Sequence, residues 1–236
     1  MISISLRLIR TIFYAFLLSL LSLMFAHAAN NNLVPKYGNV PKSDDEKVAD
    51  SRFIEDMDKQ FDGDRPKAAQ AVAQRGWEIF RTGDADTAIK RFNQAWLLDP
   101  KNVLALWGMA TVSAARNDLK TAVPLFLEAQ SFKAKAFRGE DINLNVDCAK
   151  AMSMLAVQSG DASMMKEAMA RFDQLAVSAP RHPMNWQNWA VALYFDGDYA
   201  AAWEKVAKME ALGLPQKADP NFIDALSQKM PRPATQ

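Results

Sequence analysis

Beyond residue 28, the sequence has one histidine, His182, and one cysteine, Cys148, which are the candidates for a general base and a nucleophile. A general base must reach the proton that it removes, and a reactive cysteine needs a neighbouring base or positive charge. His182 precedes Pro183 in an expected turn, and no histidine lies near Cys148 in the sequence. We therefore interpret His182 as a turn residue and Cys148 as a small packing residue.

An acidic cluster between Asp58 and Asp64 resembles a calcium-binding loop. Such a loop needs a bidentate Glu at its twelfth position, which is Ala69 when counted from Asp58. We expect Asp64 to cap a helix that has Pro66 in its first turn. The sequence also lacks a glycine-rich phosphate loop, a paired-histidine helix motif and a Cys-x-x-Cys pair, so no catalytic, metal or cofactor site is expected.

A 34-residue period dominates the middle of the chain. Large and small residues recur at this period, with Gly83, Ala88, Phe92 and Ala95 returning as Asn117, Ala122, Phe126 and Ala129. Two antiparallel helices approach closely where small residues face each other and large ones fill the gaps. The spacing resembles that of the tetratricopeptide repeat family.

This resemblance predicts an all-α fold, a right-handed α-solenoid of about four tetratricopeptide helix pairs within residues 66–217. The expected units are 69–102, 103–136, 146–182 and 183–216, with an insertion over 137–145. The third unit is expected to have a turn three residues longer than the first, because Gly160 and Phe172 lie farther apart than Gly83 and Phe92.

Both ends of a stacked array need shielding from water. Over 29–65 we expect an extended tether to Lys42 and then an N-terminal capping helix. The helix begins with the capping-box pattern of Ser43 and Glu46 and buries Val48, Ile54, Met57 and Phe61. Residues 218–236 are expected to form a C-terminal capping helix and a tail.

Residues 1–28 have the pattern of a signal peptide. Arg7 and Arg10 precede the apolar run Ile12–Phe25, and cleavage is expected after Ala28. The alternative is an uncleaved membrane anchor. With one cysteine and no Asn-x-Ser/Thr site, the exported chain is typical of a bacterial periplasmic protein. The formal net charge of the full sequence, +1, gives no indication of nucleic-acid binding.

In proteins of this family, the first helices of the repeats line a concave groove that holds a peptide. The resemblance implies that the groove positions include aromatic side chains, which could instead belong to the core. We expect Arg81, Lys101 and Lys150 to orient the partner by their charge. The expected partner-binding residues are Trp77, Phe80, Arg81, Lys101, Trp107, Thr111, Lys150, Met154, Gln187, Tyr194 and Phe195.

These observations favour a non-enzymatic periplasmic scaffold or adaptor that binds a segment of an envelope protein in its groove. No cofactor and no stable membrane anchor after signal cleavage are expected. The alternative is a binder of a small hydrophobic ligand in the same groove, and a hydrolase ranks last.

Overall fold

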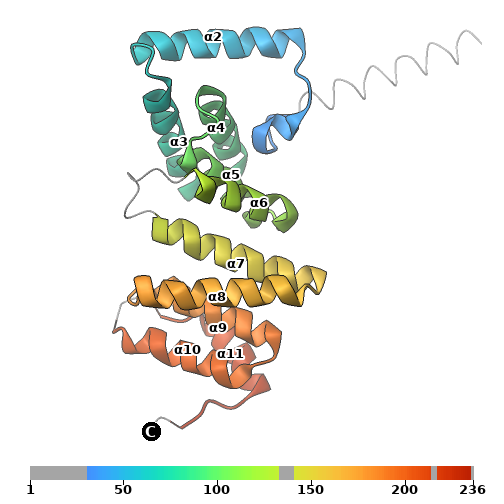
Figure 1. Ribbon diagram of the computed structural model, residues 1–236, viewed down its shortest axis with the longest axis vertical. Helices are drawn as coiled ribbons and strands as arrows, with labels where there is room; N and C mark the ends of the chain where they lie inside the picture. The colour runs from blue at the N-terminus through green and yellow to red at the C-terminus, as the bar shows by residue number, and fades with distance from the viewer. Residues whose placement is uncertain (1–30, 133–140, 214–216, 235–236) are drawn as a thin grey trace, which may run out of the picture. The chain divides into compact units, whose positions relative to one another are not determined.

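The computed structural model describes residues 31–132, 141–213 and 217–234, and within these ranges every regular element is a helix (Figure 1). The predicted signal peptide lies outside them. None of the helices in these ranges has both the length and the apolarity needed to cross a membrane. The elements are η1 (Pro35–Asn39), α2 (Asp44–Gln60), α3 (Arg65–Arg81), α4 (Ala85–Leu98), α5 (Val103–Ala115), α6 (Leu119–Ser131), α7 (Asp141–Ser159), α8 (Ala162–Ser178), α9 (Pro183–Asp196), α10 (Tyr199–Ala211) and α11 (Pro220–Lys229).

The described residues fall into two compact units, the first ending at Gly108 and the second beginning at Met109. Within each unit, consecutive helices pack in pairs, as in an α-solenoid. The all-α prediction is confirmed. Helix α5 begins in the first unit and ends in the second.

The same short turn joins the two helices of every pair. It contains a residue with positive φ, the conformation that closes a helix: Gly83 (91°), Asn117 (61°), Gly160 (70°) and Gly197 (87°). An aspartate follows each of them, and its carboxylate accepts a hydrogen bond from the backbone N–H three residues on, which caps the second helix. Gly-Asp or Asn-Asp therefore ends one helix and begins the next.

The predicted pairing of large and small residues is clearest at Phe92, whose ring is fully buried on α4. A methyl group at Gly76 of α3 would lie 2.6 Å from its Cε1 atom, and one at Gly108 of α5 would lie 2.3 Å from the same atom. Gly76 precedes Phe92 by sixteen residues, and the same interval separates a small buried residue from a larger one in each later pair: Ala110 and Phe126, Ala156 and Phe172, Ala190 and Val206.

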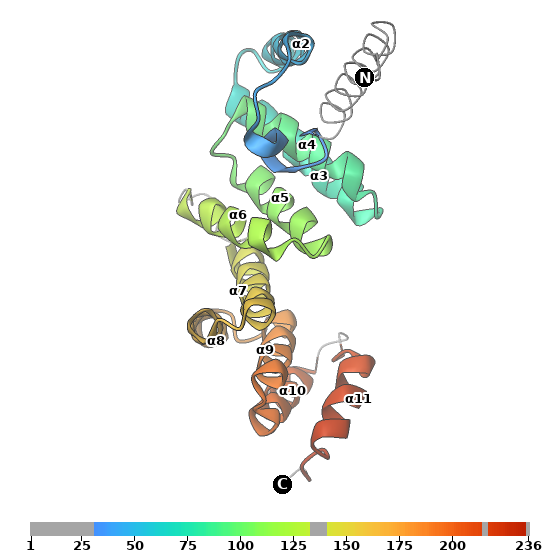
Figure 2. The same ribbon diagram turned by 90° about the vertical axis from the view of Figure 1, so that its right-hand side faces the viewer.

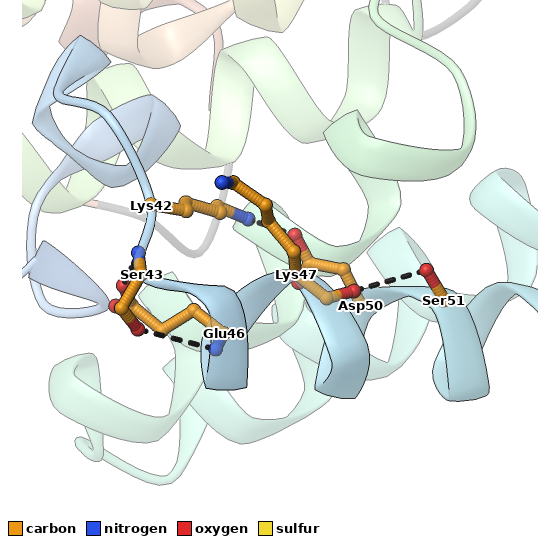
Figure 3. A network of polar contacts seen from close by, with 6 residues as sticks. All are labelled: Lys42, Ser43, Glu46, Lys47, Asp50 and Ser51. Carbon is orange, nitrogen blue, oxygen red and sulfur yellow. Dashed lines mark hydrogen bonds and ion pairs between the residues drawn. The ribbon is translucent and has the colours of Figure 1, made fainter.

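In the first unit, α2 covers the beginning of α3. The capping box of Ser43 and Glu46 is present (Figure 3). The apolar side of α2 packs against Ala68, Ala69 and Leu98 through Phe53, Ile54, Met57 and Phe61. Val48, which was expected on this side, is 49% exposed, because contact with α3 is confined to the second half of α2.

The segment before α2 differs from the expected extended tether. It folds back onto α4, where η1 packs (Figures 1 and 2). The side chain of Asn93 on α4 binds its backbone. We call residues Asn32–Lys42 the strap. Its docking depends on a contact across about sixty residues of sequence, which no local pattern reveals.

In the second unit, α7 pairs with α8 and α9 pairs with α10, while α11 packs on α10 (Figure 2). The longer turn expected in the third repeat is absent. Instead α8 has 17 residues where α4 has 14, so the three additional residues extend the helix. Helix α7 begins at Asp141, so residues 141–145 of the expected insertion are helical, whereas 137–140 lie outside the described residues.

The glycine contacts with Phe92 lead to a stability prediction. Gly108→Ala improves helix propensity by about 1 kcal/mol. Its methyl group must nevertheless displace a buried ring, at a cost of about 1–3 kcal/mol. We expect a net loss of up to about 2 kcal/mol in the free energy of unfolding, measured by urea denaturation.

The control is the same change in a Phe92→Leu background. The smaller side chain leaves room for the methyl group, so the two substitutions should be strongly non-additive. If Gly108→Ala lowered the free energy of unfolding equally in the wild-type and the Phe92→Leu chains, the proposed contact would be contradicted.

Candidate functional site

A cavity of about 210 Å³ lies among α5, α6 and α7 of the second unit. Its floor is apolar, and Asp147 and Lys150 of α7 bring charge to its lining. The lining residues are Thr111, Ala114, Ala115, Phe126, Asp147, Lys150, Ala151 and Met154.

A second cavity, of about 190 Å³, lies between α7 and α9 and shares Met154 with the first. Its other lining residues are Ser153, Val157, Gln158, Val191, Ala192 and Phe195. Val157 is 41% exposed and Phe195 is 57% exposed, so two exposed apolar side chains lie together at this cavity. We call the lining of the two adjoining cavities the trough.

The helical repeat of α7 explains why these side chains face the trough. Lys150, Met154, Val157 and Gln158 fall at i, i+4, i+7 and i+8, so they share one side of the helix. The side chain of Gln158 also donates a hydrogen bond to Oδ1 of Asn117 at 2.9 Å, which ties the end of α7 to the turn between α5 and α6. The trough is thus built on regular elements rather than on loops.

Several residues predicted to bind a partner meet in the trough. Thr111, Lys150 and Met154 line the first cavity, and Met154 and Phe195 line the second. Sequence reasoning did not select Val157. The sequence feature that could have identified Val157 is its position three residues after Met154, on an accessible face of the same helix.

Tyr194 and Gln187 of α9 line neither cavity. The Tyr194 ring lies 5.3 Å from Phe195 and 5.9 Å from Phe222 of α11, measured between centroids. Tyr194 therefore belongs to the packing between the last helix pair and the C-terminal capping helix. Gln187 is half-buried on the same helix.

The predicted aromatic residues of the first unit pack against one another. Trp77 donates its indole N–H to the carbonyl oxygen of Leu104 at 3.1 Å, and its ring lies 4.7 Å from Trp107 and 6.0 Å from Phe80. These contacts join α3 to the first part of α5, so they favour the core interpretation that the sequence left open. Arg81 lies exposed at the end of α3, and Lys101 lies exposed in the turn between α4 and α5.

His182 is the residue before α9, and its geometry fits a structural role. Its Nε2 atom lies 2.8 Å from Oδ1 of Asn143, and since that oxygen can only accept, we assign the proton to Nε2. Nδ1 is buried without a hydrogen-bond partner. Burial lowers the pKa of His182, because protonation would place an unpartnered N–H there.

The acidic residues near Asp58 also have structural partners. Arg65 donates two hydrogen bonds to the Asp58 carboxylate, at 2.9 and 2.8 Å, and these lower the pKa of Asp58. Asp64 caps α3 by accepting a bond from the backbone N–H of Lys67. Among the described residues, no three histidine, cysteine or acidic side chains are grouped so that they could hold a metal ion.

Comparison with known proteins places the fold among tetratricopeptide structures. The chain resembles the thermophilic TPR protein TTC0263 of Thermus thermophilus, with a TM-score of 0.54, 17% sequence identity, and coverage of 68% of this chain and 80% of that one. It also matches YrrB, a TPR protein described as having an unusual peptide-binding site, at a TM-score of 0.30 and 15% identity, over 73% and 97% of the two chains. No family model and no curated protein matches the sequence. The expected tetratricopeptide fold is confirmed.

The reactivity of Cys148 tests whether its thiol is buried in the folded chain. The thiol is fully buried, and burial raises its pKa to about 11. At about pH 8 we expect the native chain to react with Ellman's reagent at least about a hundredfold more slowly than the denatured chain, because the thiolate is the reactive form. Equal rates would mean that Cys148 is accessible in the native protein.

Proposed function

We propose that this protein is a non-enzymatic scaffold that binds an apolar segment of a partner protein in the trough. The observation that carries the proposal is the pair of adjoining cavities that share Met154 and leave Val157 and Phe195 exposed. Exposed apolar side chains gathered around a depression are typical of interaction sites.

The size of the cavities favours side chains of a peptide over a free small molecule. Pockets for drug-sized ligands usually enclose about 300–1,000 Å³. Each of the two cavities of the trough is smaller, at about 210 and 190 Å³. Two neighbouring cavities of this size suit two large apolar side chains of one segment, which bind as anchors while the segment itself lies along the trough.

Lys150 in the first cavity would orient the bound segment by its charge. Lys150 is exposed at the edge of the trough, one helical turn before Met154. An acidic residue near the first anchor of the partner would lie close to this ammonium group. Charge complementarity at such a rim mainly affects the association rate and the direction of binding.

The cellular location forms part of the same proposal. The predicted signal peptide, with cleavage after Ala28, would deliver the chain to the bacterial periplasm, where an envelope protein is the natural partner. Burial of Cys148 and the structural contacts of His182 support a binding role rather than catalysis.

Peptides selected from a display library against the purified chain would test the proposal. We expect them to carry paired large apolar residues. Phe195→Ser should weaken the selected peptides by about tenfold or more, because it removes the most exposed apolar side chain of the trough.

Val177→Ser is the matched control. Val177 is 81% exposed on α8 and lines neither cavity. Its replacement should leave binding unchanged, whereas similar effects of both substitutions would refute binding in the trough. Native mass spectrometry tests the alternative function, the binding of a small hydrophobic ligand. A hydrophobic molecule that copurifies with the chain and that the selected peptides do not displace would favour this alternative.

A further inference from the structure

The strap is bound to α4 by one buried side chain, Asn93. Its Oδ1 atom accepts the backbone N–H of Lys36 at 2.8 Å. Its Nδ2 group donates to the carbonyl oxygens of Asn32 at 3.2 Å and of Val34 at 2.9 Å. Asn93 has no exposed surface, so without these three bonds its amide would be buried and unpaired.

A second anchor of the strap is the ring of Tyr37, which is 8% exposed. The ammonium group of Lys42 lies 3.3 Å from the centre of this ring, where the negative face of an aromatic attracts a cation. Lys42 also forms an ion pair with Asp50 of α2 (Figure 3). The Tyr37 ring thus lies against Lys42, which ties the end of the strap to α2 through Asp50.

The backbone between these anchors is strained. Four consecutive residues have left-handed φ values: Lys36 (52°), Tyr37 (55°), Gly38 (69°) and Asn39 (53°). Only the glycine adopts this region without a steric cost. Such a turn persists where its surroundings hold it, so the Asn93 and Tyr37 contacts must offset the strain.

All three bonds of Asn93 go to main-chain atoms, so this contact is independent of the side chains that the bound segment carries. Strain in the bound turn favours release, and Val34 and Val40 remain exposed, so these two side chains add little to docking. The strap therefore has the character of a peptide ligand that is covalently joined to its receptor.

We propose that the face of α4 around Asn93 is a second peptide-binding site, for which the strap is a dissociable ligand within the chain. Its ligand class is a peptide that offers two carbonyl groups and an amide at alternate residues, followed by an aromatic anchor. The site shares no residue with the trough, so it stands independently of the function proposed above.

The test uses the full-length chain with Tyr37→Ala, which removes one anchor and leaves Asn93 in place. Hydrogen exchange at the Lys36 amide should accelerate by at least about tenfold. A labelled synthetic peptide of residues 31–42 should then bind this variant at least about tenfold more tightly than the wild type, where the attached strap competes at an effective concentration in the millimolar range.

Two changes identify the Asn93 contact. Asn93→Leu in the Tyr37→Ala chain should abolish peptide binding. In case that variant fails to fold, a peptide methylated on the backbone nitrogen of the residue matching Lys36 removes the same hydrogen bond and should lose about tenfold in affinity. Unchanged protection of the Lys36 amide in Tyr37→Ala, no peptide binding to it, or full affinity of the methylated peptide would each overturn the proposal.

Discussion

The close fit between one large side chain and the small residues opposite it is the constraint on which the rest of this structure depends. Phe92 occupies space that any side chain at Gly76 or Gly108 would need. Because the interval between small and large partner recurs in every pair, each second helix is seated against its first helix at the same height. Interiors packed this closely have no alternative register of equal energy.

The same fit explains why the trough exists. Alanines on α7 and α9, among them Ala149, Ala156 and Ala192, satisfy the packing around Phe172. The larger apolar residues on the other side of α7 and at the end of α9 are therefore not needed by the core. Met154, Val157 and Phe195 remain on the surface and provide the site. One set of small residues thus fixes the fold and frees a second set for binding.

The sequence predicted the features that depend on local spacing. The turns at Gly83 and Asn117 and the buried Phe92 are where the period places them. The sequence predicted only part of the candidate site, because residues that line a groove and residues that fill a core are of the same apolar types. Trp77 is an example. Its hydrogen bond to the carbonyl oxygen of Leu104 indicates a packing role, and no sequence pattern predicts that bond. The strap was missed because its docking joins segments far apart in the chain.

The central claim is that the trough contacts a partner protein in the cell. Photo-crosslinking from a probe at position 195 measures this directly, with the more exposed apolar position 177 as the control. The account predicts that the probe at 195 traps a defined envelope protein through an apolar segment, and that the probe at 177 does not. The same products from both positions, or none from 195, would contradict it.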